Sequence, residues 1–500
     1  MKSVRRHRVF HPAVTVILLS SGALCAADDA AARHTFFGPI GVSETGNTRK
    51  NSQGDLAGFD LERTKAILRS EIKATLKDTG IPSISIALLK RDRIIWAEAF
   101  GYSNVKLKVP ASPRTIYGTG SCLKPVTAMA VMQLVDKGKL KLDDPINKYL
   151  GDHAVKDLSG QGKPVTVRHL LGHYSGLTVD FETVPLEKRK LPRTLEQLAS
   201  VLKAEGPPGV RYRYSNSGYA LAGLLVQKVS RKTYERYLVE NILRPLGIRH
   251  AGPINPTPEM IEELALPYRL ENRRAVPVAR HRYDVYPAGD AYLSVPAMAR
   301  ILLTHLNAGK LNDMTILSAA SVREMQKRQF GGRDGLDFGI RMLGGEKLIM
   351  HGGGVPGYST KFIVAVDSKV GVYIAANAGR AQTPNRILAQ RALDLLRGKK
   401  LGTGMVRQRV GLGFVPAVDR KSGTVRIKEV FPRSPASRAG LSPADAVRKV
   451  NGVSVAGKSL KEFLLMIGGP AGKGVKLELV DSNRKQRTVT LTRQKFLMPG

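Results

Sequence analysis

The chain has 500 residues and is 42% hydrophobic, so it can form roughly two to four domains with sizeable cores. Its 50 glycines and 28 prolines are close to average usage, which excludes collagen-like and low-complexity proteins. The formal net charge of +38 favours anionic partners, such as an anionic envelope surface, although a generally basic and soluble protein would carry it too. No nucleic-acid-binding motif accompanies this charge, so we expect no nucleic acid as a partner.

The first residues have the pattern of a secretory signal peptide. A basic head, MKSVRRHR, precedes the apolar stretch AVTVILLSSGAL and small residues suited to cleavage near Ala27. The apolar stretch is too short to span a bilayer, and Leu24 before Cys25 disfavours lipidation. We therefore predict a signal peptide over residues 1–27, export to the periplasm or the medium, and a polar, Gly-rich linker over residues 28–58.

Hydrophobic periodicity outlines the elements of the first domain. Residues 59–80 have helical spacing, and the β-rich runs IPSISIALLK and RIIWAEAFGYSN flank the polar turn Arg91-Asp92, which predicts a hairpin. Two later β-rich runs are KFIVAVD and VGVYIAANAG. Further helices are predicted at 121–137, 166–177, 194–204, 217–229, 233–243, 295–308, 318–327 and 385–397. This order predicts an α/β domain over residues 59–400, with a sheet built from both ends of the domain and an all-helical subdomain inserted between them.

The composition changes near residue 400. The basic, Gly-containing stretch RGKKLGTGMVRQR is typical of a linker, and short β-rich runs follow it: TVRIKEV, AVRKVNG, VKLELVD and RTVTLTR. One helix is predicted at about 459–467. Residues 404–500 are therefore predicted to form a compact second domain.

Ser121 is a candidate nucleophile, because Lys124 follows it at the helical i, i+3 spacing that puts both side chains on one face. A serine hydroxyl attacks when a base takes its proton, and a lysine is such a base when burial or positive neighbours lower its pKa. In the alternative interpretation, Ser121 is an ordinary N-cap and Lys124 lies on the surface. Cys122 between them is expected to be a small buried residue rather than a thiol nucleophile.

Two further stretches supply partners for Ser121. In YSN, the hydroxyl of Tyr214 could relay a proton and the amide of Asn216 could hold a substrate carbonyl. In HGGG, which begins at His351, glycines just before a predicted strand would let a substrate lie along the strand edge. The N–H of Gly354 could join that of Ser121 to form an oxyanion hole.

The motifs SCLK, YSN and HGG stand in the order S-x-x-K, Y-x-N and H-x-G, with flanks such as KLKLDDPINKYL and TVRHLLGHYSGL. Over about residues 60–398 the chain thus resembles the serine β-lactamase-like superfamily: class C β-lactamases, DD-peptidases, D-aminopeptidases and related esterases. The resemblance implies an antiparallel sheet and a serine hydrolase that forms an acyl-enzyme. It also implies that Ser121 is the nucleophile and that Lys124 and Tyr214 share the roles of base and acid. The residues implied to bind substrate are Asn216, His351, Gly352 and Gly353. The N–H of Gly354 is implied to stabilise the oxyanion.

The third motif departs from the family pattern. His351 stands where β-lactamases and DD-carboxypeptidases usually carry Lys, and Gly352 stands where they carry Thr. A neutral imidazole and a missing hydroxyl would hold a substrate carboxylate less well. We therefore expect a small-molecule or peptide substrate, namely an ester, an amide or a D-amino-acid peptide of envelope origin. The alternatives are a β-lactamase or DD-carboxypeptidase proper, and a catalytically weak protein that binds and senses envelope peptides.

Asp290 is a second departure, since the family usually has Gly after P-A-G in the stretch YPAGDAYLS. It could bind an amine if it faced the site, but a solvated loop residue is the more frequent outcome. His169 and His173 have the i, i+4 spacing of metal ligands, but no Glu base or third ligand accompanies them. Helix packing and capping are therefore expected for both histidines, and we expect neither a metal nor another cofactor.

The second domain resembles a PDZ domain of the bacterial type, on the stretches VGLGFVP and SPASRAGLSPADAVRKVNGVSV. The resemblance implies a loop that presents backbone N–H groups to a chain-terminal carboxylate, while a peptide or protein C-terminus adds to the adjacent strand edge. That loop consists of Gly411, Leu412, Gly413 and Phe414. The alternative is a PDZ domain that only packs on the catalytic domain.

Overall fold

The computed structural model describes residues 59–499, except residues 159, 161, 179–180, 186–191, 250–251, 254–257, 400–405, 420–421, 444 and 482–483. The predicted signal peptide and the predicted linker after it lie outside the described residues. In the described part of the chain, no helix is long and apolar enough to cross a membrane.

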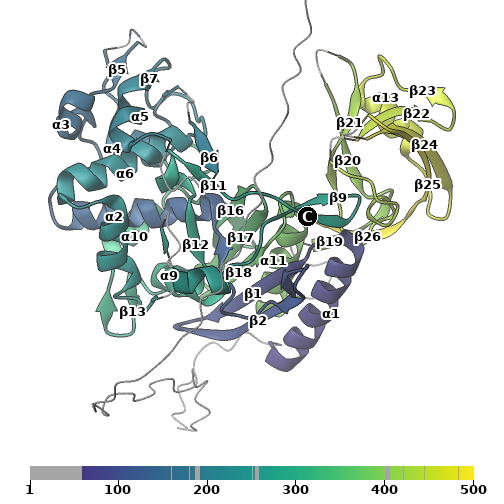
Figure 1. Ribbon diagram of the computed structural model, residues 1–500, viewed down its shortest axis with the longest axis horizontal. Coiled ribbons are helices and arrows are strands. Elements are labelled where there is room, and N and C mark those ends of the chain that lie inside the picture. Colours follow the sequence, from purple (N-terminus) through teal and green to yellow (C-terminus); the bar gives the residue numbers. More distant parts are fainter. Residues whose placement is uncertain are drawn as a thin grey trace, which may run out of the picture. The chain divides into compact units, whose positions relative to one another are not determined.

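A seven-stranded antiparallel sheet forms the centre of the first domain (Figure 1). Its first hairpin consists of β1 (Ser83–Lys90) and β2 (Arg93–Asn104), joined at the predicted turn. β1 also pairs with β18 (Val370–Ala376), so strands from both ends of the domain meet inside the sheet, as predicted. The other strands are β3 (Val109–Pro110) beyond β2, and β17 (Tyr358–Ala365), β16 (Glu346–Val355) and β15 (Gly339–Leu343) beyond β18.

Both faces of this sheet are buried at β1, because successive strand residues point to opposite faces and every residue from Ser83 to Leu89 is buried. Ile86 packs into the apolar core that also contains residues of α1 (Leu61–Thr79) and α11 (Gln382–Leu396). Its neighbour Ala87 packs into the core on the other face, which contains residues of α9 (Val295–Leu306) and of the helical subdomain. The sheet, which contains strands from both ends of the domain, therefore lies between two layers of helices.

The helical subdomain consists of short helices, several of which begin at polar caps. Thr166 and Thr194 each form a capping box with the residue three positions later. The predicted helix at 233–243 is divided, because a π-helical turn over Val239–Leu243 follows α7. The helices between the two halves of the sheet include α2 (Lys124–Asp136), α4 (Val167–Leu171), α5 (Leu195–Val201), α6 (Asn216–Ser230), α7 (Tyr234–Leu238) and α10 (Ala319–Met325).

β16 is the main correction to the predicted elements. His351 and the glycines after it were expected to precede a strand, but they lie inside β16 and pair along its length with β17, from His351 opposite Phe362 to Gly354 opposite Ser359. Backbone pairing, rather than side-chain packing, holds this end of the strand. Glycine within a strand often marks a site where another backbone approaches closely.

The second domain has its own sheet (Figure 1), and its buried apolar residues form a separate core. The predicted helix at about 459–467 is α13 (Leu460–Ile467), which begins at the N-cap Ser459 and buries Phe463 in this core. The consecutive strands of the main sheet are β20 (Phe414–Val418), β21 (Val425–Val430), β22 (Ala446–Val450), β24 (Gly474–Val480) and β25 (Gln486–Thr492).

Candidate active site

Ser121 lies in a tight turn that leads into α2. The turn is the 3₁₀ helix Gly120–Leu123, and Gly120 at its start has the left-handed backbone angle φ 53°. Thr119 is the N-cap of this turn, and its side chain forms no capping hydrogen bond. The N-cap interpretation of Ser121 is therefore wrong. Its hydroxyl instead accepts a hydrogen bond from Nζ of Lys124 at 3.0 Å.

Lys124 is fully buried at the start of α2, so the alternative of a surface lysine is wrong as well. Its Nζ donates a second hydrogen bond to the carbonyl oxygen of Ala288 at 2.7 Å. Burial lowers the pKa of Lys124 to about 8, although the charge of Asp337 acts in the opposite direction. An amine with this pKa is partly neutral near neutral pH and can take the proton of Ser121.

Tyr214 lies beside this pair, two residues before the first residue of α6, Asn216. Nζ of Lys124 is 4.8 Å from the centre of the Tyr214 ring, and Ser121 is close enough to the Tyr214 hydroxyl to act on its pKa. Tyr214 is 39% exposed, yet loss of solvation raises its pKa, so the hydroxyl keeps its proton. Tyr214 is thus placed to pass a proton rather than to act as an anionic base.

Gly353 and Gly120 allow the turn of the nucleophile to lie directly against β16. A Cβ at Gly353 would lie 2.0 Å from the carbonyl oxygen of Thr119, and a Cβ at Gly120 would lie 2.4 Å from the backbone nitrogen of Gly354. The hydroxyl of Thr360 donates to the same Thr119 oxygen at 2.6 Å and holds the turn in place. Any side chain at either glycine would push the two segments apart.

The N–H of Gly354 points away from β17. Val355 and Tyr358 close the two-residue turn between β16 and β17, and hydrogen-bonded pairs alternate along such a hairpin. Gly354 therefore belongs to a pair whose N–H groups face outward. β15 pairs with β16 only as far as Met350, so no described strand covers this edge. The geometry supports the predicted oxyanion hole formed by the N–H groups of Gly354 and Ser121.

His351 is a cation in this site, because both of its ring nitrogens face acceptors. Nδ1 lies 2.8 Å from the carbonyl oxygen of Gly352, and Nε2 lies 3.5 Å from Oδ2 of Asp337. A carbonyl oxygen and a carboxylate only accept, so these neighbours favour a protonated ring, although Oδ2 of Asp337 has no hydrogen-bond partner among the described residues. Burial lowers the pKa of His351, but the charge and hydrogen bond of Asp337 outweigh it and raise the pKa to about 9. The expected neutral imidazole is therefore wrong.

Asp337 and His173 extend the site behind His351, although no sequence motif marks them as site residues. Oδ1 of Asp337, which is buried, lies 2.9 Å from Nε2 of His173. Nδ1 of His173 accepts a hydrogen bond from the N–H of Ser215 at 3.1 Å, so His173 is the neutral tautomer with its proton on Nε2. Its ring centre lies 4.4 Å from that of Tyr214. One carboxylate thus holds a neutral and a charged imidazole.

The backbone gives an independent sign that this cluster is unusual. His173 and Asp337 have φ angles of 64° and 65°, which non-glycine residues adopt rarely and which concentrate at functional sites. His173 therefore does more than the expected helix packing. His169 does cap its helix as expected, since its Nδ1 accepts a hydrogen bond from the N–H of Thr166 at 3.1 Å. Across the described residues, no group of three potential metal ligands occurs.

Comparisons with known proteins agree with this geometry. The family model described as Beta-lactamase matches residues 68–397, and the model described as PDZ domain matches residues 404–480. The chain belongs to the beta-lactamase family. Its structure is similar to that of the octameric penicillin-binding protein homologue from Pyrococcus abyssi, with a TM-score of 0.59 and 26% sequence identity, covering 87% of this chain and 98% of that chain.

A curated relative covers a smaller part of the chain. Protein flp from Staphylococcus aureus (strain N315) is 29% identical over 224 residues, which are 44% of this chain and 44% of that protein. The chain therefore spans less than half of the length of this relative. Members of the beta-lactamase family with this fold are generally serine hydrolases, which agrees with the placement of Ser121 beside a buried amine.

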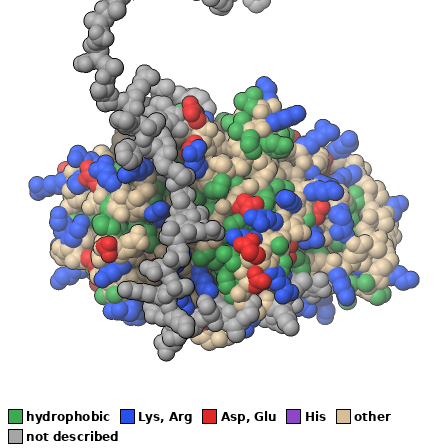
Figure 2. Space-filling model, turned by 90° about the horizontal axis from the view of Figure 1, so that it is seen from below, with side chains coloured by type: hydrophobic (Ala, Val, Ile, Leu, Met, Phe, Trp, Pro, Cys, Tyr) green, Lys and Arg blue, Asp and Glu red, His purple; other side chains and the backbone are tan. Residues whose placement is uncertain are grey.

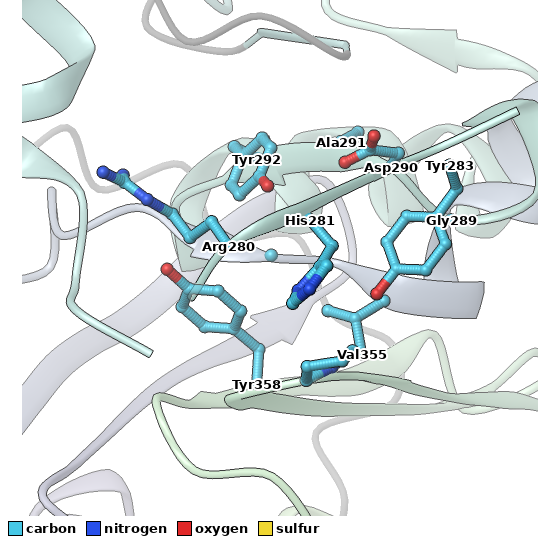
Figure 3. Close-up of a pocket in the computed structure, with 11 residues that line it drawn as sticks. Arg280, His281, Tyr283, Gly289, Asp290, Ala291, Tyr292, Val355 and Tyr358 are labelled. Atoms are coloured by element: carbon cyan, nitrogen blue, oxygen red, sulfur yellow. The ribbon is translucent and has the colours of Figure 1, made fainter. Parts of the chain in front are cut away.

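Cys122 and Asp290 lie beside the motifs of this beta-lactamase domain, and the structure agrees with the prediction for the first but not for the second. Cys122 is buried, as expected for a packing residue, and its Sγ lies 3.2 Å from Oγ1 of Thr360. Asp290 was expected in a solvated loop, but it is only 4% exposed and lines a pocket (Figure 3). That expectation is wrong because Asp290 directly precedes β12 (Ala291–Leu293), a buried strand that pairs inside the domain.

The loop of the PDZ domain presents its backbone rather than its side chains. Leu412 and Phe414 are buried in the core, and Gly413 has φ 86°. A Cβ at Gly413 would lie 2.0 Å from Cβ of Ser434, so only glycine fits there. Gly411 ends the preceding strand, and β20 after the loop is the last strand of the described sheet on its side. This arrangement supports the predicted peptide site along β20.

Proposed function

We propose that the protein is an exported serine hydrolase that forms an acyl-enzyme on Ser121 with an ester, amide or peptide substrate. The observation that carries this proposal is the buried contact of Lys124 Nζ with the Ser121 hydroxyl at 3.0 Å. The second partner of Nζ is the neutral carbonyl of Ala288, and no described carboxylate forms a salt bridge with it. A buried lysine without such a partner destabilises a fold, so its place beside a hydroxyl indicates chemistry.

The reaction would proceed in two steps. In acylation, neutral Lys124 takes the proton of Ser121 as Oγ attacks the substrate carbonyl carbon, and the N–H groups of Ser121 and Gly354 stabilise the oxyanion. The bond to the leaving group then breaks, and the hydroxyl of Tyr214 passes the proton from Lys124 to that group. In deacylation, water loses a proton to the same groups and attacks the acyl carbon. Ser121 regains its proton as the acid product leaves.

The third motif favours substrates that have no essential carboxylate. The pKa of His351 is raised to about 9, but Asp337 beside it neutralises the resulting charge, and both ring nitrogens face oxygen acceptors. Gly352 supplies no hydroxyl. A substrate carboxylate would find no free donor on these two residues, which supports esters and neutral amides over β-lactams. The preference for esters and neutral amides that the sequence predicts therefore remains. Its cause is the neutralising Asp337 and not an uncharged imidazole.

Export and an envelope location complete the proposal. The signal-peptide pattern of residues 1–27 supports export, and the net charge of +38 supports contact with an anionic envelope surface. Lys and Arg side chains are spread over much of the face in Figure 2, as a diffuse attraction to a surface requires. The PDZ domain would bind the C-terminus of an envelope peptide or protein along β20.

Hydrolysis of two chromogenic substrates tests the proposal. The kcat/KM values of the full chain are measured on a p-nitrophenyl ester and a chromogenic cephalosporin, for wild type and Ser121→Ala. We expect ester hydrolysis that Ser121→Ala abolishes, and a lower kcat/KM for the cephalosporin. Absence of hydrolysis in a protein with native circular dichroism would contradict the proposal. A wide preference for the cephalosporin would replace it with β-lactamase activity.

A further inference from the structure

The turn between β2 and β3 exposes several apolar side chains. Within eight residues, Tyr102, Val105, Leu107 and Val109 are 46%, 39%, 68% and 41% exposed. Single exposed apolar residues are normal on a protein surface, whereas a group of them marks a site of interaction. We call residues 102–110 the β2–β3 tip. It lies at the edge of the central sheet that is opposite β15.

Hydrogen bonds hold this tip in a fixed shape. The N–H of Val105 donates to the hydroxyl of Tyr268 at 2.8 Å, and the N–H of Leu107 donates to Oδ1 of Asn104 at 3.1 Å. The N–H of Lys108 donates to the carbonyl oxygen of Val105 at 3.3 Å and closes the turn. The turn therefore holds Leu107 outward, although an aliphatic side chain in water is unfavourable.

The charge of the β2–β3 tip is positive only. Lys106 and Lys108 flank Leu107, and residues 101–114 contain no Asp or Glu. Both lysines are exposed, and no described carboxylate forms a salt bridge with either of them. A fixed apolar side chain between two free cations suits an anionic membrane, because the apolar group enters the interface while the ammonium groups stay at the lipid phosphates.

Two features disfavour a protein partner at this tip. β3 has only two residues, and its Pro110 lacks the N–H that a further strand would need, so we do not expect another chain to extend the sheet here. Lysine is depleted in protein–protein interfaces, whereas here it directly flanks the most exposed apolar residue. A negatively charged lipid surface therefore fits the tip better than a second copy of the chain does.

We propose that the β2–β3 tip docks on an anionic phospholipid membrane, with Leu107 inserted between the headgroups and Lys106 and Lys108 at their phosphates. The proposal rests on the envelope contact in the proposed function and deepens it, because it replaces a diffuse attraction by one defined contact. It does not require hydrolysis at Ser121, so the two proposals can fail separately.

Tryptophan probes test this inference in the full chain. The sequence has one tryptophan, Trp96, which is buried, so an added tryptophan reports on its own position. Leu107→Trp places the probe at the tip. The matched control is Leu465→Trp, at a leucine of α13 that is 72% exposed. Each protein is mixed with phosphatidylcholine vesicles that contain or lack phosphatidylglycerol and have acyl chains brominated near the headgroup.

We expect the emission of the Leu107→Trp probe to shift to shorter wavelength and to be quenched by bromine only on vesicles that contain phosphatidylglycerol. Leu465→Trp should show neither change. Lys106→Gln with Lys108→Gln, added to Leu107→Trp, should raise the lipid concentration for half-maximal quenching by about tenfold or more, as for two basic residues at an anionic surface. Because all variants share residues 1–58, the local probe separates the tip from any other contact.

Lys461→Gln with Lys473→Gln is the charge-matched control, because it removes two exposed lysines outside the tip. It should leave the quenching of the Leu107→Trp probe nearly unchanged. Equal effects of the two double changes, or binding to anionic vesicles without quenching of this probe, would show a diffuse attraction only and overturn the inference. A shift that appears in concentrated protein without vesicles would overturn it in favour of a second copy.

Failure of the proposed hydrolase has a different signature. Ester hydrolysis and fluorophosphonate labelling of Ser121 are measured on the same preparations. Hydrolysis without any contact of the tip with lipid would overturn only the present inference. Contact of the tip with lipid in a folded protein that neither hydrolyses esters nor is labelled would overturn the hydrolase and support the docking surface.

Discussion

The two halves of the active site are built in different ways. The nucleophile half consists of Ser121 and Lys124, three positions apart on one turn and joined by a hydrogen bond of 3.0 Å. The half around the third motif brings together His351, Asp337 and His173, which come from β16, the segment before β15 and the turn after α4. The first half obtains its chemistry by burying one amine. The second shares one buried carboxylate between two imidazoles.

The difference shows that the base and the cation of this site are set by opposite physical effects. Burial lowers the pKa of Lys124 to about 8, whereas Asp337 outweighs burial and raises the pKa of His351 to about 9. Asp337 also couples the halves, because its charge raises the pKa of Lys124 against the effect of burial. A change at Asp337 should therefore alter both halves, whereas a change at Ser121 should alter only the first.

Ser121→Ala should have the largest effect of any single change. We expect kcat/KM on a p-nitrophenyl ester to fall by about 10⁴-fold or more, because the residual rate then comes only from binding and the oxyanion hole. The melting temperature should stay within a few degrees of wild type, since the hydroxyl forms no capping bond. Cys122→Ala is the matched control and should remain active. Substantial turnover by folded Ser121→Ala would remove the nucleophile assignment.

Lys124→Met and Tyr214→Phe test whether the nucleophile half acts as one unit. Each should slow acylation by about 10²–10⁴-fold, as expected for proton transfer, while Met retains most of the buried volume of Lys124. The double variant should be little slower than the worse single variant. Stopped-flow release of p-nitrophenol measures the acylation rate. Fully additive losses of activation free energy would show that the two groups work independently.

Asp337→Asn should have a smaller effect, because Asp337 positions and charges other residues. We expect kcat/KM to fall by roughly 10- to 100-fold, below the upper range of direct proton transfer. Asp334→Asn is the control in the same segment and should change kcat/KM by less than about threefold, as for a site without direct hydrogen bonds to the histidines. An unchanged kcat/KM in Asp337→Asn would show that the half of the site around the third motif does not contribute to catalysis. A loss as large as that of Lys124→Met would place Asp337 in proton transfer.

The pH dependence of the rate tests the coupling between the halves. We expect kcat/KM to rise with pH through an apparent pKa of about 8, because only neutral Lys124 accepts the proton of Ser121. In Asp337→Asn the rise should move to lower pH, since loss of the negative charge destabilises the ammonium form of Lys124. Profiles at constant ionic strength measure this shift. A shift to higher pH would show that the coupling has the opposite sign.

Substrate selectivity should change least. In His351→Lys with Gly352→Thr, the lysine would have free N–H donors, and a Cβ at Gly352 has room because its nearest neighbour is Cδ of Lys361 at 3.8 Å. We expect the ratio of kcat/KM on a chromogenic cephalosporin to that on the ester to rise a few-fold, as for one partly exposed ion pair. An unchanged ratio would show that the third motif does not set selectivity.

Much of the fold could be predicted from the sequence, because its signals are local. Two β-rich runs around a polar turn marked the hairpin at Arg91-Asp92, and helical periodicity marked most helices. β16 could not be predicted, because its glycines lack strand-forming side chains and its end is held by pairing with β17.

In the candidate site, too, residues with a local sequence signal could be predicted, and residues joined by long-range contacts could not. The spacing of Ser121 and Lys124 is visible in the sequence, and the resemblance supplied Tyr214 and His351. The contact of His173 with Asp337 joins residues 164 positions apart, and no pattern in one sequence records it. The burial of Asp290 was missed for the same reason, since it depends on how β12 pairs inside the domain.

The central claim is that a buried Lys124 activates Ser121 for covalent catalysis. Peptide mass spectrometry after a timed reaction with a fluorophosphonate tests it most directly, because it reports both the labelled residue and the rate. We predict one adduct, on Ser121, that forms rapidly in wild type and at least about 10²-fold more slowly in Lys124→Met. An adduct on Cys122, or equal labelling rates of Ser121 in the two proteins, would contradict the claim.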